Sequence, residues 1–209
     1  MSWTRLQKEQ TGQVISRIAQ SDTVDISVFN SGATEVAIRK LPFYRNYKLY
    51  RLTNYASLPS FTMQFLSNDV EFHYLDGTSG TIYTVNERDP IIIDQFNAID
   101  YIDFFFMNVQ GTEGDIFIIK DPAKLPFINS FDEYQKKSIF ENFKPLDVTA
   151  DLHPGHYKVT GTLYYDGSLI GASIVVSPDG KLHFAEQHLL LQGIYFPFSP
   201  TAHMWVAGD

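Results

Sequence analysis

The sequence predicts a mainly β (α+β) protein, in which antiparallel sheets form a sandwich or barrel-like core. Aromatic residues make up 15% of the chain, and their side chains favour the half-buried surface of a sheet. Apolar and polar residues alternate along many short segments, as they do in strands. Clusters of Asn, Asp, Ser and Gly separate these segments, as expected of hairpin turns.

The N-terminal residues 4–19 predict a helix, and a strand over residues 13–19 is the alternative. Val14 and Ile18 share a face at helical spacing. Gly12 disfavours the helix by about 1 kcal/mol relative to alanine.

Strands are expected over most of the residues that follow. Alternation predicts strands at residues 24–29, 47–52 and 61–66, and a hairpin over residues 70–86 that turns at residues 76–80.

Residues 101–109 are apolar on both of the faces that alternation creates, which is typical of a strand in the centre of a covered sheet. Asp103 shares one face with Tyr101, Phe105 and Met107. If Asp103 is buried among them, desolvation raises its pKa into the range of a general acid. Asp103 is therefore a candidate catalytic residue, and pairing with a lysine or a backbone donor is the alternative.

Residues 121–126 are the most linker-like stretch, because they contain two prolines among charged and small residues. We expect a single β-rich domain over residues 1–209. The alternative is a division near residues 121–130 into domains at 1–121 and 130–209.

The clearest helix is predicted near residues 130–143. Ser130 and Glu133 have the spacing of a capping box, and Pro145 ends the pattern. A meander of three strands follows at residues 157–165 and beyond, with an Asp-Gly pair in each of its turns.

Charge and composition exclude several classes of partner. The net charge of −8 and the scattered Lys and Arg residues argue against nucleic acid and against an anionic membrane surface. The absence of cysteine excludes disulfides, thiolate nucleophiles and cysteine metal ligands. The N-terminal segment has no apolar core of a secretory signal, and no stretch reaches the roughly 20 apolar residues of a membrane helix. We therefore expect a soluble, cytoplasmic protein.

Asp151, His153 and His156 form the most suggestive cluster. Pro154 and Gly155 fit the centre of a type II turn, whose ends lie within about 7 Å, so both imidazoles can converge on a metal ion. Asp151 would add an oxygen ligand or orient a ring. His156 is also a candidate catalytic residue. The alternative is a surface turn with both rings in solvent.

Two other pairs of polar residues contain a histidine. Glu71 and His73 share one face of a predicted strand, either as an acid–base pair or as a plain polar face. His183 and His188 are five residues apart, so they face opposite sides of a regular strand and do not share a site with Glu186.

Interleaved tyrosines and basic residues form the most basic stretch of the chain. Such a stretch suits sugars, peptides or anionic small molecules, and an exposed strand pair with core-facing tyrosines is the alternative. The residues are Tyr44, Tyr47, Tyr50 and Tyr55, with Arg39, Lys40, Arg45, Lys48 and Arg51. The apolar residues 195–205 are expected to dock on their own domain or on a partner subunit.

No nucleophile elbow, phosphate-binding loop, dinucleotide fingerprint or His-Glu-x-x-His motif is present. The favoured hypothesis is a non-catalytic β-rich module that binds a small-molecule ligand or a protein partner. The second is a hydrolase or isomerase with His and carboxylate chemistry, with or without a divalent metal. The third is a structural subunit of a homo-oligomer. The sequence names no cofactor.

Overall fold

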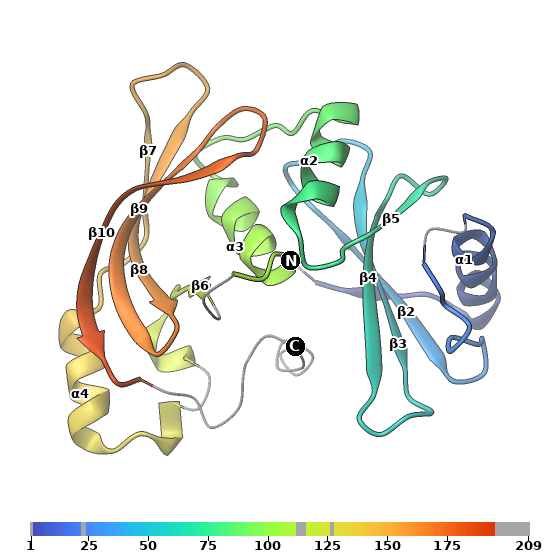
Figure 1. Ribbon diagram of the computed structural model, residues 1–209, viewed down its shortest axis with the longest axis horizontal. Coiled ribbons are helices and arrows are strands. Elements are labelled where there is room, and N and C mark those ends of the chain that lie inside the picture. The colour runs from blue at the N-terminus through green and yellow to red at the C-terminus, as the bar shows by residue number, and fades with distance from the viewer. Residues whose placement is uncertain (1, 22–23, 112–115, 126–127, 195–209) are drawn as a thin grey trace. The chain divides into compact units, whose positions relative to one another are not determined.

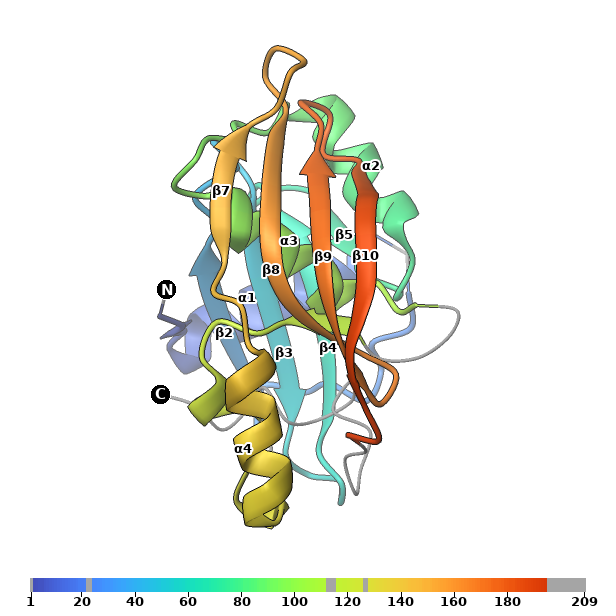
Figure 2. The same ribbon diagram turned by 90° about the vertical axis from the view of Figure 1, so that its left-hand side faces the viewer.

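The structure is a computed structural model that describes every residue except 1, 22–23, 112–115, 126–127 and 195–209. Its described residues form two antiparallel sheets of five strands each and four α-helices (Figure 1 and Figure 2). The mainly β, α+β class is therefore confirmed. Neither sheet closes on itself, and the more specific expectation of a sandwich or barrel-like core stays a prediction.

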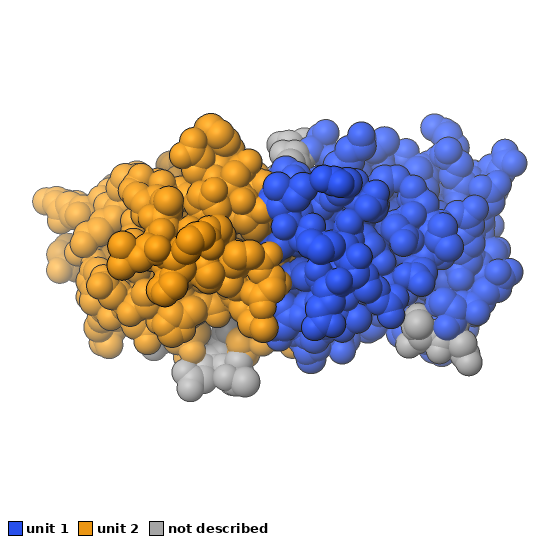
Figure 3. Space-filling model, turned by 90° about the horizontal axis from the view of Figure 1, so that it is seen from above, with its two compact units in different colours: residues 1–92 blue, residues 93–209 orange. Residues whose placement is uncertain are grey.

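Two compact units divide the chain, Met1–Ile92 and Ile93–Asp209 (Figure 3). The linker-like segment near residues 121–130 lies inside the second unit, where its described part forms short 3₁₀ turns. The expectation of a single domain stays a prediction.

The first unit is a meander whose strands pair in chain order. Its elements are β1 (Thr4–Arg5), α1 (Lys8–Gln20), β2 (Thr34–Lys40), β3 (Lys48–Asn54), β4 (Phe61–Ser67), β5 (Phe72–Tyr74) and α2 (Ser79–Arg88). The N-terminal helix is confirmed. It begins later than the sequence suggests, because Gln7 is the N-cap and forms a capping box with Gln10.

Strand pairing builds the core of the first unit. Val36 lies opposite Leu52, and Leu52 lies opposite Met63, so these apolar side chains share one face of the sheet. Val14 and Ile18 of α1 are buried against that face. One helix therefore covers one side of the sheet.

Three predicted strands are wrong. Residues 24–29 form turns and loop rather than a strand, and residues 81–85 belong to α2 instead of a hairpin. Residues 101–109 lie almost wholly in the helix α3 (Ala98–Asn108). Periodicity cannot separate a strand that is apolar on both faces from a helix that is buried nearly all round. The strand β2, in contrast, was not predicted.

The second unit contains the predicted three-stranded meander, which is confirmed. Its elements are α3, β6 (Ile116–Ile118), η1 (Pro122–Lys124), η2 (Ile128–Ser130), α4 (Glu133–Asn142), β7 (Asp147–Ala150), β8 (Tyr157–Tyr165), β9 (Ser168–Val176) and β10 (Leu182–Gln192). The sheet order is β10-β9-β8-β6, and β7 pairs with β8 beside β6.

The helix α3 covers one face of this sheet and lies behind the strands in Figure 2. Ile174 of β9 lies opposite Phe184 of β10, and the Phe184 ring stacks on Phe106 of α3 with centroids 6.2 Å apart. The Tyr101 hydroxyl of the same helix donates to the Gly180 carbonyl at 2.8 Å. These contacts fix α3 on the meander.

The helix α4 is confirmed, but its cap lies two residues beyond the predicted Ser130. Asp132 is the N-cap, and its side chain accepts a hydrogen bond from the Gln135 backbone N–H at 2.7 Å. The Gln135 side chain accepts in turn from the Asp132 N–H at 3.1 Å. The capping box therefore joins Asp132 to Gln135.

Replacing this cap tests the start of α4. Asp132→Ala should lower the free energy of unfolding by about 1 kcal/mol, because it leaves a helix N–H without its acceptor. Asp132→Asn keeps a capping oxygen and should lose much less. Urea unfolding followed by circular dichroism measures both, and equal losses in the two variants would contradict the capping role.

Candidate functional site

The face of the β7–β10 sheet that α3 does not cover is apolar at one end and polar at the other. At the apolar end, Tyr164 and Leu169 are buried against Ile139 of α4, which lies at the lower end of the sheet in Figure 2. Farther along the same two strands stand Thr160 and Ser173, which are direct partners across β8 and β9. The polar end of this face therefore carries hydroxyl groups, whereas the apolar end is buried in the core.

A β-bulge changes which β10 side chains reach this face. His183 lies opposite Val175, and His188 lies opposite Gly171, with a register shift after Phe184 between them. The bulge adds one residue to β10, and the two β9 partners are an even number of residues apart. The expectation that His183 and His188 face opposite sides is therefore wrong. Both lie on the polar face.

Glu186 joins the same face. It lies directly opposite Ser173, so the bulge brings a carboxylate beside the hydroxyl groups as well. The sequence argument missed this grouping because it assumed a regular strand.

Gly171 leaves the room that the His188 ring occupies. A Cβ at position 171 would lie 2.4 Å from His188 Cε1 and 2.5 Å from Nε2, closer than the non-bonded contacts that Cβ atoms make in proteins. The imidazole therefore lies directly against the Gly171 backbone, and another residue type there would displace it.

A recess of about 170 Å³ opens beside this ring, and all of its described lining residues belong to the second unit. Gly171 forms part of its floor. Its polar lining residues are Lys144, Thr160, Ser173, Glu186 and His188.

The polar side chains of the recess are not paired with one another. Within the described part of the chain, Ser173 is only 7% exposed, yet its hydroxyl makes no hydrogen bond. The Lys144 ammonium and the Glu186 carboxylate likewise form no ion pair with a described residue. Lys144, Glu186 and His188 are exposed, so the recess is open to solvent, and its polar groups have hydrogen-bonding capacity that the described residues do not use.

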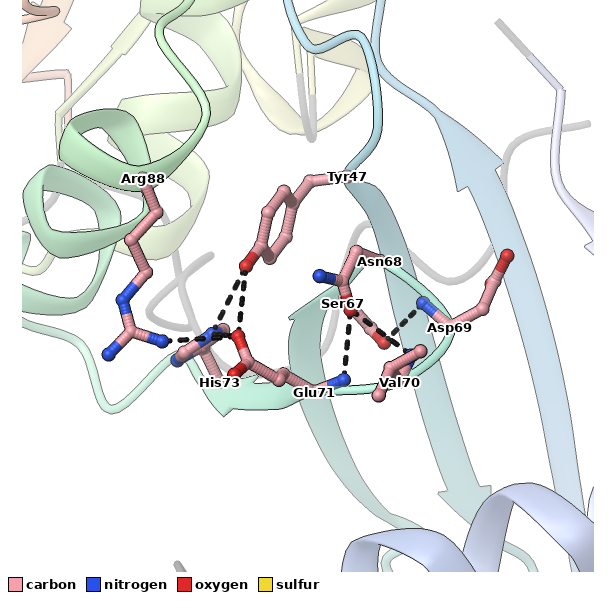
Figure 4. Close-up of polar contacts among 8 residues, drawn as sticks. All are labelled: Tyr47, Ser67, Asn68, Asp69, Val70, Glu71, His73 and Arg88. Atoms are coloured by element: carbon pink, nitrogen blue, oxygen red, sulfur yellow. Dashed lines mark hydrogen bonds and ion pairs between the residues drawn. The ribbon is translucent and has the colours of Figure 1, made fainter.

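A second polar cluster lies in the first unit, and its members satisfy one another (Figure 4). Glu71 Oε2 lies 3.1 Å from Arg88 Nη1 and 3.6 Å from His73 Nε2. The Tyr47 hydroxyl donates to the same oxygen at 3.4 Å. Glu71 and His73, which the sequence pairs as acid and base, do come together, but Glu71 is held by its neighbours.

Burial sets the protonation of this cluster. It lowers the pKa of His73 below the usual 6.5; the charge of Arg88 lowers it further, and Glu71 opposes the change. Burial also raises the pKa of Tyr47, and the charge of Glu71 adds to that effect. At neutral pH the cluster therefore contains a neutral imidazole, a protonated phenol and one ion pair, that of Glu71 with Arg88.

The aspartate next to this cluster holds the turn before β5. Asp69 accepts hydrogen bonds from the Tyr50 hydroxyl and, at 2.6 Å, from the Lys48 ammonium. Burial raises the pKa of Asp69, but these hydrogen bonds outweigh burial and leave it below its usual value. The Asp69 carbonyl also accepts from Arg17 of α1 at 2.7 Å. These contacts tie the helix to the sheet.

Asp151, His153 and His156 lie together at the turn that joins β7 to β8. Their geometry is local: Asp151 Oδ2 lies 3.2 Å from His153 Nδ1, and His156 Nδ1 lies 3.2 Å from the Pro154 carbonyl. The two rings are 5.5 Å apart. No group of three or more His, Cys, Asp or Glu side chains among the described residues has the arrangement of a metal site. Metal binding at this turn, and a catalytic role for His156, stay predictions.

Asp103 lies on a helix and pairs with a lysine. Its Oδ2 is 2.6 Å from Lys120 Nζ. The premise of burial among Tyr101, Phe105 and Met107 does not hold as stated, because residues two apart on a helix point about 200° apart. Pairing with a lysine is the alternative that the structure supports, and the catalytic role of Asp103 stays a prediction.

The basic and aromatic stretch makes contacts within its own unit. Arg39 and Arg51 flank the Trp3 ring, at 5.0 Å and 4.3 Å from its centroid. Tyr44 donates to Asn86 at 2.5 Å. These side chains are engaged in the fold, while the apolar residues 195–205 lie outside the described part of the chain.

The sequence matches no family model, and neither a curated protein nor a solved structure is significantly similar to it. Among the helices described, none has the length and apolar character needed to cross a membrane.

The lowered pKa of His73 predicts a dependence of stability on pH. Because the folded state holds His73 below its unfolded pKa of about 6.5, the unfolded state binds the proton first. The contribution to stability is complete above about pH 6.5, and it is lost as the pH falls through the folded pKa. His73→Gln should therefore reduce the loss of stability between pH 7 and pH 5. Urea unfolding at several pH values measures it.

His183→Gln is the matched control, because His183 is an exposed histidine of the other unit. It should leave the pH profile almost unchanged. If the His73 and His183 variants had the same profile as the parent protein, the cluster would not be the source of the effect.

Proposed function

We propose that the protein is a non-catalytic binding module that holds a small polar ligand in the recess beside Gly171. One observation carries the proposal: hydroxyl, imidazole, carboxylate and ammonium groups line a single recess and have no partners among the described residues. Ligand sites typically combine a preformed concavity with a few convergent polar groups. Glu71, by contrast, is surrounded by partners of its own.

The spacing of the recess groups favours binding over hydrolysis. Ser173 and His188 are diagonal neighbours on adjacent strands, because their direct partners are Glu186 and Gly171. Ser173 makes no hydrogen bond to His188. An activated nucleophile normally lies within about 3.2 Å of its base. Binding is therefore the function that this arrangement supports best.

The size of the recess limits the ligand. Its volume of about 170 Å³ is below the roughly 300–1,000 Å³ of sites for drug-sized molecules. A metabolite with few heavy atoms fits this space, and a nucleotide or a lipid does not.

A ligand screen with a Gly171→Ala variant tests the proposal. Small polar metabolites are added to the purified full chain, and the midpoint of thermal unfolding is measured. A ligand at about a hundred times its Kd adds roughly 2.7 kcal/mol of stability, which raises the midpoint by several degrees. Gly171→Ala should abolish the rise, because the added methyl group displaces the His188 ring.

Gly80→Ala is the matched control. A Cβ there lies 3.6 Å from the nearest atom, which is an ordinary contact, so this variant should respond like the parent protein. A stabilising ligand that acts equally on Gly171→Ala would place the site elsewhere, and a library without any stabilising compound would overturn the binding function. Turnover of the ligand would favour the hydrolase or isomerase alternative instead.

A further inference from the structure

We propose that the recess selects small zwitterions of amino-acid size, with the ligand carboxylate at Lys144 and the ligand ammonium at Glu186. This inference rests on the binding function proposed above, and it names the chemical class of the ligand.

The two charged residues reach the recess from opposite sides. Lys144 runs alongside β8, where its N–H donates to Thr162 Oγ1 at 2.7 Å and its carbonyl accepts from the Thr162 N–H at 3.1 Å. Glu186 lies on β10, at the far edge of the meander. Strands lie about 4.8 Å apart, so three spacings put roughly 14 Å between the two backbones.

This separation leaves room for a ligand between the charges. Both side chains line the recess, but they form no ion pair with each other at the 4.0 Å limit that defines one. The Lys144 ammonium and the Glu186 carboxylate therefore lie more than 4.0 Å apart in the structure. A small molecule with one charge of each sign bridges such a gap.

Further hydrogen-bonding groups lie between the two charges. Thr160 of β8 and Ser173 of β9 are direct partners in the middle of the sheet, and the His188 ring rests on the Gly171 backbone beside them. A carboxylate accepts several hydrogen bonds and an ammonium donates three. The hydroxyl and imidazole groups supply the partners that one lysine and one glutamate leave unfilled.

Other ligand classes fit less well. The net charge of −8 repels simple anions from the protein, whereas a zwitterion has no net charge to be repelled. Among the described residues, no Phe, Tyr or Trp lines the recess, so a sugar lacks the large ring on which its apolar face stacks best. A simple cation leaves Lys144 without a partner.

The test compares a zwitterion with its two halves. Full-length protein labelled with ¹⁵N in histidine is titrated with L-alanine, β-alanine, propionate, ethylamine and glycerol. The His188 imidazole signal, assigned with His188→Gln, reports on the recess. At least one of the two amino acids should bind about tenfold more tightly than propionate, ethylamine or glycerol, because only a zwitterion engages both charges.

Removing each charge of the recess in turn should show which charge of the ligand it binds. Lys144→Gln should weaken binding of the amino acid about tenfold and leave the weak binding of ethylamine unchanged. Glu186→Gln should weaken the amino acid similarly and leave propionate unchanged. Lys8→Gln removes an exposed lysine of the first unit as a matched control, and it should change neither affinity.

The outcomes separate the two proposals. If glycerol or propionate binds at the recess as tightly as the amino acids, the zwitterion inference is overturned and the binding function stands. The zwitterion inference is also overturned, and the binding function stands, if none of the five probes shifts the His188 signal while another metabolite gives a Gly171-dependent rise in thermal stability. If neither experiment detects a ligand, both proposals fail.

Discussion

The alternation of side chains along antiparallel strands is the constraint on which both units depend. In the first unit it places Val36, Leu52 and Met63 on one face, and α1 buries that face. In the second unit the same alternation creates two faces. Helix α3 covers one face, and α4 covers one end of the opposite face. Among the described residues, most of the second face that no helix covers is polar, because a large apolar surface there would have needed another layer. The recess therefore lies where helical cover ends.

Much of this fold could be predicted from sequence wherever local signals agreed with one another. The C-terminal meander combines alternation with Asp-Gly turns, and α4 has helical spacing that ends before a proline; both elements are confirmed, although the cap of α4 is Asp132 and not the predicted Ser130. Prediction failed at residues 101–109, because a segment that is apolar all round has no informative period. Its assignment depends on which neighbours bury it. The phenylalanines of α3 meet the sheet on one side, a tertiary fact that no local pattern contains.

The candidate site illustrates a sharper limit. His183, Glu186 and His188 are visible in the sequence, and the argument that separated them was correct for a regular strand. One extra residue after Phe184 reverses that argument, because a bulge shifts every later side chain to the other face. Residue types alone do not signal this bulge. The sequence therefore shows which residues carry reactive or hydrogen-bonding groups, but it does not show the face of the sheet on which they lie.

Gly171 bears on whether the recess has a function at all. Glycine inside a strand destabilises it by roughly 0.5–1 kcal/mol relative to alanine, and its neighbours Ile170 and Ala172 are buried strand residues. What the glycine permits is the placement of an exposed imidazole that makes no hydrogen bond to a described residue. Such a placement adds little to stability. Gly171 weakens the strand and orients an exposed histidine beside hydroxyl and charged groups that have no partner among the described residues, which is consistent with the ligand-binding function proposed above.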